Sequence, residues 1–316
     1  MNLFRSGDHL KRLAVLTVAL CFASSGTALA ADIPTTAQAH GVGGATRVAT
    51  GEVTPGSASS ASKNRAANED RAPAQTAAAY RQYTTWYGPV TMQPGDWWEA
   101  WVYCPSGMQV TGGGEKNSSI GGITLHDTYP LPDSSGWKVK VSNRATSAQT
   151  FTVYAVCFSG LSSYYQTTAK ASVGPTTHGG AIANCSPSQQ VLGGGGYSDT
   201  MNNDVSTSNF GSTQWAYGME NLDTVARTTT AVALCAGGVA NYQLVEGAST
   251  PVGAHQQATA IAYCPAGKWI VGGGHYSSWR FQRMTDSYPD GQAWRVYVQN
   301  DLDFGIDFIA RAICGN

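Results

Sequence analysis

The sequence predicts an all-β protein made of three tandem antiparallel units in a pseudo-threefold arrangement, stapled by disulfides. Three observations support this prediction. A glycine-triplet motif occurs three times at constant spacing. Apolar and polar residues alternate with a period of two in the stretches after it, which is the pattern of half-buried strands. Gly, Pro, Ser and Asp interrupt the chain at short intervals, so each unit, about 80 residues long, is expected to hold five or six short strands.

The first element of each unit is a strand of small residues that ends in a cysteine and leads into the glycine motif. The motif reads CPSGMQVTGGG from Cys104, CSPSQQVLGGG from Cys185 and CPAGKWIVGGG from Cys264, and the first glycine always lies eight residues after the cysteine. Such a triplet predicts a bulge or a close crossing of backbones where no Cβ fits. A phosphate-binding loop is disfavoured, because the Lys-Ser/Thr pair of such loops is missing.

The second element begins at Trp137, Trp215 and Trp294, in the stretches WKVKVSN, WAYGMEN and WRVYVQN. In the first copy the alternation turns the tryptophan and two valines to one face and two lysines to the other. The tryptophans are therefore predicted to form the cores of the units. An asparagine ends each stretch, six residues after the tryptophan, and is predicted to be a turn residue.

The third element ends in a second cysteine, fourteen residues after each of these asparagines. Symmetry favours pairing within each unit, as Cys104–Cys157, Cys185–Cys235 and Cys264–Cys314, and the small residues beside each cysteine let two strands approach closely. A second symmetric set would instead link neighbouring units, as Cys157–Cys185, Cys235–Cys264 and Cys104–Cys314. Disulfides are expected because the N-terminus indicates export to an oxidising compartment.

Residues 1–30 are predicted to be a secretory signal peptide. A basic start precedes a short apolar run, and Ala28–Ala30 supplies the small residues for cleavage before Ala31. The bulky Leu20 before Cys21 disfavours a lipid anchor. The apolar run is too short for a transmembrane helix. The protein is therefore expected to be secreted, either to the periplasm or outside the cell.

Residues 31–79 are small and polar and contain no aromatic residue, so they are predicted to be a disordered linker or a propeptide. The three β-units are expected to span 80–158 (unit 1), 159–236 (unit 2) and 237–316 (unit 3). The net charge is −1, which argues against a nucleic-acid partner held by charge. No histidine pair has metal-ligand spacing and no G-x-S-x-G occurs, so neither a metal nor a cofactor is predicted.

The pattern of CPxGxxVxGGG, WxVxVxN and AxAxC resembles a module that recurs in secreted bacterial proteins of unassigned function. The resemblance covers nearly all of 80–316 and implies export and a β-fold, without catalytic residues to carry over. WEAWVYCPSG in unit 1 is also loosely similar to the vitelline membrane outer layer proteins, whose three Greek-key sheets form a β-prism. That similarity implies a prism, while three small sandwiches remain an open alternative.

Candidate ligand-contacting residues lie in two places where the three copies diverge. One is just after the glycine triplets. The other is the HDTYP stretch of unit 1 and the matching TDSYP stretch of unit 3, which unit 2 replaces with STSNF. The candidates are His126, Asp127, Tyr129, Tyr197, His275, Tyr276, Trp279, Asp286 and Tyr288. Unit 1 adds further tryptophans at Trp86, Trp97, Trp98 and Trp101. Aromatic rings beside polar groups are the inventory of a sugar-binding site, and they serve equally well in a core or at an interface between units.

The predicted function is that of a secreted, non-catalytic protein that binds a carbohydrate or a cell-surface glycan in a lectin-like manner. Symmetric repeats would give such a protein several sites at once. One alternative is a structural or host-directed factor that binds proteins. The other is a glycoside hydrolase, which requires two carboxylates across one cleft, and Asp127 and Asp286 would supply them only if units 1 and 3 met there.

Overall fold

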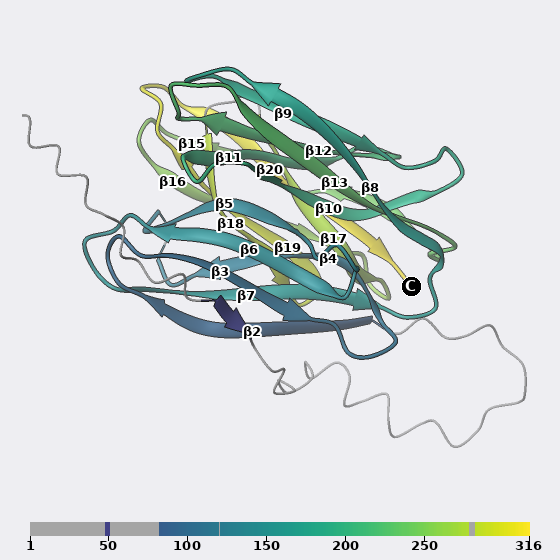
Figure 1. The fold of residues 1–316 in the computed structure, drawn as a ribbon. Coiled ribbons are helices and arrows are strands. Elements are labelled where there is room, and N and C mark those ends of the chain that lie inside the picture. The colour runs from purple at the N-terminus through teal and green to yellow at the C-terminus, as the bar shows by residue number, and fades with distance from the viewer. Residues whose placement is uncertain (1–47, 51–81, 120, 278–281) are drawn as a thin grey trace, which may run out of the picture. The chain divides into compact units, whose positions relative to one another are not determined.

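The computed structural model describes residues 48–50, 82–119, 121–277 and 282–316, and they form β-strands joined by short turns (Figure 1). The all-β prediction is confirmed. None of these residues belongs to a helix that is long and apolar enough to cross a membrane. The predicted signal peptide lies outside the described residues, as does most of the predicted linker.

Each unit contributes a similar set of strands. Unit 1 has β2 (Gln82–Met92), β3 (Trp97–Tyr103), β4 (Gln109–Asn117), β5 (Ile123–Pro130), β6 (Gly136–Asn143) and β7 (Gln149–Phe158). Unit 2 has β8 (Ser162–Val173), β9 (His178–Asn184), β10 (Gln190–Ser198), β11 (Asn203–Phe210), β12 (Gln214–Asn221) and β13 (Arg227–Gly237). Unit 3 has β14 (Gln243–Glu246), β15 (Thr250–Val252), β16 (Gln257–Tyr263), β17 (Trp269–Ser277), β18 (Gln282–Asp290), β19 (Ala293–Asn300) and β20 (Ile306–Gly315).

The strands of every unit split into two three-stranded halves that pair in the same order. In unit 1 the halves are β2-β7-β4 and β3-β6-β5, and in unit 2 they are β8-β13-β10 and β9-β12-β11. In unit 3, β14 and β15 together take the place of the first strand beside β20 and β17, and the other half is β16-β19-β18. Each half of a unit continues into a sheet that it shares with another unit, so no unit is a free-standing sandwich.

Each open sheet joins halves from two neighbouring units. Sheet A joins units 1 and 2 where β5 meets β10, sheet C joins units 2 and 3 where β11 meets β17, and sheet B joins units 3 and 1 where β18 meets β4. One residue pair marks each junction: Thr128 with Gly196, Ser208 with His275, and Ser287 with Glu115. Figure 1 shows these junction strands between the outlying strands β2 and β9. The order of the units is therefore cyclic, and unit 3 returns to unit 1.

The glycine triplets lie where the three units meet, and each glycine has a different steric reason. The first glycines crowd the backbone of neighbouring units, since a Cβ on Gly112 would lie 2.8 Å from the Cα of Gly272. The second glycines face the indole rings of the repeated tryptophans, which a Cβ would overlap. The third glycines face the carbonyl oxygens of Thr128, Ser208 and Ser287 at the sheet junctions. The predicted close crossing of backbones is confirmed. The pairing of β4 with β7 also shifts register between Val110 and Gly112, as at a β-bulge.

The repeated tryptophans fill the interior, with Trp137, Trp215 and Trp294 at most 1% exposed. Two of them also satisfy their indole N–H groups. The Nε1 atoms of Trp137 and Trp294 donate to Thr128 and Ser287 across 2.9 Å. The two acceptors lie on β5 and β18, which are strands at sheet junctions. These hydrogen bonds therefore connect the core of a unit to the junction between units.

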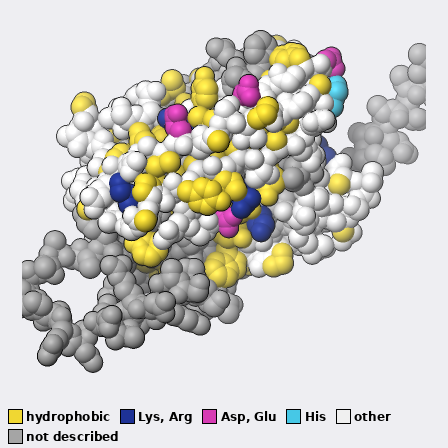
Figure 2. All heavy atoms as spheres, turned by 180° about the vertical axis from the view of Figure 1, so that it is seen from behind, with side chains coloured by type: hydrophobic (Ala, Val, Ile, Leu, Met, Phe, Trp, Pro, Cys, Tyr) yellow, Lys and Arg dark blue, Asp and Glu magenta, His cyan; other side chains and the backbone are white. Residues whose placement is uncertain are grey.

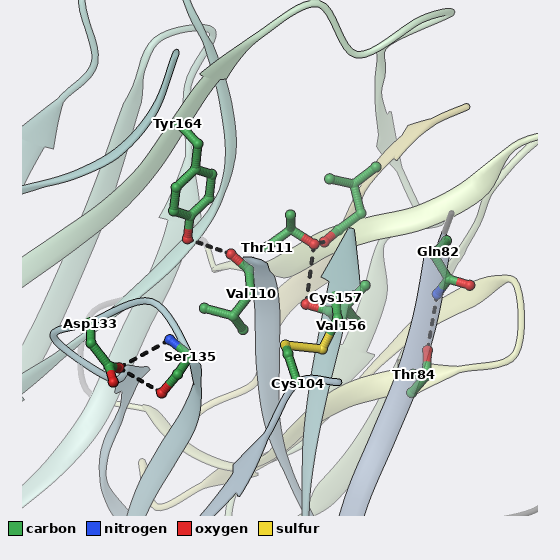
Figure 3. The surroundings of a disulfide bond; sticks show 11 residues. Gln82, Thr84, Cys104, Val110, Thr111, Asp133, Ser135, Val156, Cys157 and Tyr164 are labelled. Carbon is green, nitrogen blue, oxygen red and sulfur yellow. Dashed lines mark hydrogen bonds between the residues drawn. A yellow bond between two sulfur atoms is a disulfide. The ribbon is translucent and has the colours of Figure 1, made fainter. Parts of the chain in front are cut away.

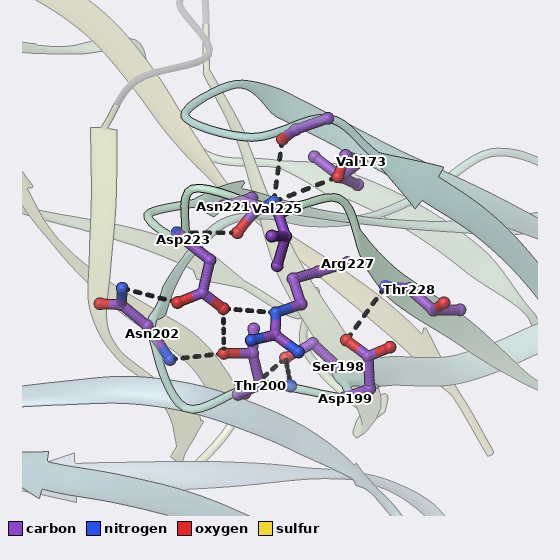
Figure 4. A network of polar contacts seen from close by, with 11 residues as sticks. Val173, Ser198, Asp199, Thr200, Asn202, Asn221, Asp223, Val225, Arg227 and Thr228 are labelled. Atoms are coloured by element: carbon purple, nitrogen blue, oxygen red, sulfur yellow. Dashed lines mark hydrogen bonds and ion pairs between the residues drawn. The ribbon is translucent and has the colours of Figure 1, made fainter.

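The repeated asparagines clamp three chain segments together. Asn221 donates from Nδ2 to the carbonyls of Val173, Gly174 and Val225, and its Oδ1 accepts from the backbone N–H of Asp223 (Figure 4). Asn143 and Asn300 make the corresponding contacts in the other units. They are turn residues, as predicted, and in addition their buried amides fix the neighbouring loops.

The disulfides join Cys104 to Cys157, Cys185 to Cys235 and Cys264 to Cys314, which is the within-unit set. Each bond links the end of a strand in one sheet to a strand in another sheet, so three bonds tie all three sheets. Beside the first bond, Thr111 donates to the carbonyl of Val271 in unit 3, and Tyr164 of unit 2 donates to Val110 (Figure 3). Covalent links therefore lie next to contacts between units.

One short strand falls in the region predicted to be a linker. Strand β1 (Val48–Thr50) pairs in parallel with β3 at the edge of sheet A. All other strand pairs in the described part of the chain are antiparallel.

Candidate ligand-binding surface

The outer face of sheet A brings together several of the predicted contact residues. In β3 and β6 one set of alternating residues, including Val102 and Val139, is buried in the core. The opposite set therefore points away from it. The register places Trp101 beside Lys138 on β6, and Lys138 beside Tyr129 on β5. These three side chains form a row across the sheet.

Aromatic side chains from two units meet in this row. The rings of Tyr129, in unit 1, and Tyr197, in unit 2, lie with their centroids 4.8 Å apart. The ammonium of Lys138 lies 5.9 Å from the ring of Trp101 and 6.0 Å from that of Tyr129, which is within cation–π range. Trp101 also donates from Nε1 to the hydroxyl of Tyr103. Trp101, Tyr129 and Tyr197 are partly exposed, and Tyr103 is 39% exposed.

Alternating charges run alongside the rings. Glu99 pairs with Lys138 at 2.6 Å and with Lys140 at 3.3 Å, and Lys140 pairs with Asp127 at 3.0 Å. Burial alone would raise the pKa of Glu99, but the two lysines outweigh it and lower that pKa. Burial opposes the charge of Lys140 as well, yet the two carboxylates raise its pKa. We call this group, with Trp101, Tyr129 and Tyr197, the sheet A surface.

Asp127, a buried member of this surface, lies at the junction of units 1 and 2. Its side chain is 1% exposed, and Oδ1 accepts from the backbone N–H of Ser198 on β10 across 2.9 Å. The carboxylate thus continues the hydrogen bonding between β5 and β10 beyond their single register pair. Burial raises the pKa of Asp127 to about 6, against the opposing effects of Lys140 and the Ser198 N–H.

Asp286 and Tyr288 occupy the matching position on sheet B. Asp286 accepts from the backbone N–H of Asn117, across the junction of units 3 and 1. Its cross-strand neighbour is Tyr297, where Asp127 has Lys140. Burial raises the pKa of Asp286 to about 7. The two aspartates lie in different sheets, and each is bound to the backbone of its own junction.

The ring of Tyr288 stacks on that of Tyr154, with a centroid distance of 5.6 Å and an interplanar angle of 23°. Lys116 lies over the same ring at 5.6 Å. Tyr288 is only 4% exposed. Sheet B therefore buries the tyrosine whose counterpart on sheet A, Tyr129, is accessible.

His126 and His275 point into the protein. Nδ1 of His126 donates to the carbonyl of Asn203 and Nε2 lies 2.7 Å from Oγ of Ser142, while Nε2 of His275 lies 3.1 Å from the carbonyl of Ser206. Both side chains are at most 1% exposed. Burial lowers the pKa of each to about 4, so both are neutral near pH 7.

Among the other predicted contacts, Tyr276 is 53% exposed. Its equivalent in unit 2 is Tyr197. Trp279 lies outside the described residues. A ligand role for all nine residues stays a prediction, and Tyr129 and Tyr197 are the two that the fold brings together at the surface.

Sequence reasoning did not assign Glu99, Lys138 and Lys140 to a site. Their signal is the alternation of WEAWVY and WKVKVSN, which places them on the solvent face. The pairing of β3 with β6, and of β6 with β5, is needed to bring them beside Tyr129. Within the described residues, no three His, Cys, Asp or Glu side chains are grouped to hold a metal ion. Figure 2 shows one face of the protein, where hydrophobic side chains are interspersed with a few charges of either sign.

Glu115 is a buried carboxylic acid of a different kind. It is 0% exposed, and neither carboxylate oxygen has a hydrogen-bond partner among the described residues. Burial, followed by the nearby charge of Asp286, raises its pKa well above the ordinary value. Gly196 and His275 take its place in the other units. Burial in the folded protein therefore favours the neutral form of this carboxylic acid.

Comparison with known proteins found no match, either among family models or among curated protein sequences.

Proposed function

We propose that this is a secreted, non-catalytic protein that binds a carbohydrate through the sheet A surface. The observation that carries the proposal is the row of Trp101, Lys138 and Tyr129, extended by Tyr197 from the next unit. Flat apolar rings lie side by side on an open sheet face, with charged hydrogen-bonding groups next to them.

The chemistry of a sugar fits both parts of this surface. The C–H faces of a pyranose ring pack on aromatic rings, while its hydroxyls need directional donors and acceptors. Lys138 and Lys140 supply donors, and Glu99 supplies acceptors. Because Lys138 already lies within range of Trp101 and Tyr129, a sugar over either ring would be close to a charged donor.

Export is the second part of the proposal. Three disulfides join the described strands, and disulfides persist in oxidising compartments. The basic start, apolar run and Ala28–Ala30 of the sequence agree with export. N-terminal sequencing of the protein recovered from the periplasm and the medium should find Ala31 as the first residue or, if the linker is removed, a start near residue 80. Recovery of intact protein from the cytoplasm alone would contradict this part.

Binding is tested with a glycan array and with pull-down on insoluble polysaccharides. The wild-type protein should bind a subset of saccharides, and Trp101→Ala and Tyr129→Ala should each weaken binding by roughly tenfold or more, in line with the loss of one aromatic contact. Tyr263→Ala is the matched control, because Tyr263 is 66% exposed and lies on sheet B.

A blank array together with no retention on polysaccharides would overturn the proposal. Equal losses for Tyr129→Ala and Tyr263→Ala would place the site elsewhere on the protein.

A further inference from the structure

We infer that the sheet A surface selects saccharides that carry a carboxylate, and that protonation of Asp127 switches this selection on. The inference rests on the proposed function, and it adds a ligand class and a means of control. The structural basis is the chain of ion pairs from Lys138 to Glu99, Lys140 and Asp127.

The charges of this chain balance only while Asp127 is ionised. Two lysines then face two carboxylates, and Lys140 lies between them, 3.3 Å from Glu99 and 3.0 Å from Asp127. When Asp127 takes up a proton, Lys140 keeps only Glu99, which it shares with Lys138. One positive charge is then unbalanced beside Tyr129, at the place where a sugar would stack.

Of the two carboxylates in this chain of ion pairs, Asp127 is the one that loses its charge first as the pH falls. Its side chain is 1% exposed, whereas that of Glu99 is 23% exposed and contacts both lysines. The pKa of Asp127 is raised to about 6 by burial, while the lysines lower that of Glu99. A change from about pH 8 to about pH 5 therefore alters Asp127 and leaves Glu99 ionised.

The other groups around Asp127 keep their charge over this range. Lys140 faces it from β6 and has a raised pKa. Burial raises the pKa of Tyr129, on the same strand, to about 12, and also raises that of Tyr217 on β12. His126 precedes Asp127 on β5, and burial lowers its pKa to about 4. From β10 the backbone N–H of Ser198 contacts the carboxylate, and the Tyr197 ring packs on Tyr129.

Protonation does not remove the junction contact. A neutral carboxylic acid keeps a carbonyl oxygen that still accepts from the Ser198 N–H. The surface thus gains a positive charge while β5 and β10 stay joined. A ligand carboxylate would then form a charge-assisted hydrogen bond with Lys140, whereas a neutral sugar gains nothing from the change.

The experiment compares two probes of equal length, an oligosaccharide containing glucuronic acid and its neutral glucose counterpart, by calorimetry at about pH 5 and about pH 8. Wild-type protein should bind the acidic probe roughly tenfold more tightly at the lower pH, and the neutral probe equally at both. Asp127→Asn should bind the acidic probe tightly at both pH values, because the amide is neutral and still accepts from Ser198 N–H. Lys140→Met should bind it weakly at both.

Asp286→Asn is the matched control. It changes the corresponding junction aspartate on sheet B, which has Tyr297 in place of a lysine, and should leave the pH dependence of acidic-probe binding as in the wild type. Melting temperatures show whether each variant is folded, and if Asp127→Asn is not, Lys140→Met still decides.

Three results would count against the inference: a wild-type preference for the acidic probe that is the same at both pH values, a pH dependence that survives in Asp127→Asn, or one that survives in Lys140→Met. If neither probe nor any array saccharide binds at either pH, the proposed function itself fails.

Discussion

At the scale of single residues, the interior holds ionisable groups that most β-proteins keep at the surface. Glu115, His126 and His275 are at most 1% exposed. Burial pushes carboxyl groups and imidazoles toward their neutral forms. Their effects on stability therefore have opposite pH dependences, and each can be isolated by one substitution.

Glu115→Gln should stabilise the protein at alkaline pH. The folded-state pKa of Glu115 lies well above the ordinary value of 4.5, so its contribution to stability is complete below pH 4.5 and is lost as the pH rises through the folded pKa. At about pH 9 the variant should be more stable than the wild type by about 1–2 kcal/mol, and near pH 4 the two should agree. Urea unfolding at both pH values measures this.

The exposed Glu246 provides the control, since Glu246→Gln should give no such difference beyond the small effect of a surface ion pair. An alkaline destabilisation that persists unchanged in Glu115→Gln would show that Glu115 is not its source.

His275→Gln should protect against acid. The pKa of His275 is lowered by burial from 6.5 to about 4, so unfolded chains bind more protons than folded ones between these values, and stability falls as the pH drops. The wild type should lose about 3 kcal/mol more than the variant between about pH 7 and about pH 4. His255→Gln is the control: it alters a histidine whose side chain is 64% exposed, and it should not remove the acid sensitivity that His275 causes.

At the scale of strands, the glycine triplets determine how closely elements approach. Gly113→Ala places a methyl group against the indole of Trp137, which cannot move away because it is packed in the core. We expect a loss of about 2–4 kcal/mol in the free energy of unfolding. In Gly305→Ala the new methyl would have its nearest neighbour at 3.5 Å, so this control should stay within about 0.5 kcal/mol of the wild type.

Local patterns predicted most strands but not how the strands form sheets. Alternation in WKVKVSN is a property of a single strand, and constant spacing between cysteines favoured the observed disulfides. A junction, by contrast, is marked by one residue pair such as Thr128 with Gly196, too little to leave a pattern in the sequence. His126 lies where β5 shifts register between Leu125 and Asp127, and its burial there could not be predicted from the HDTYP stretch alone.

At the scale of the whole molecule, the sheets belong to pairs of units. Tyr129 and Tyr197 show what this means for the candidate surface, because they come from units 1 and 2 and meet only when the junction is formed. Unit 1 supplies every residue of the sheet A surface except Tyr197, which unit 2 adds across the junction. The sequence indicated three copies of one pattern, but a site shared between copies depends on their order in space.

The cyclic order of the junctions has a consequence for the covalent chain. Unit 3 pairs with unit 1 in the same way as unit 1 pairs with unit 2. We therefore expect the fold not to depend on which unit the chain begins and ends in. A circular permutant that opens the chain between β7 and β8, and joins Asn316 to Gln82 through a short flexible linker, should fold with the same three disulfides. Its melting temperature and peptide map would be compared with those of residues 80–316, and a permutant that fails to fold would mean that the ring has a fixed beginning.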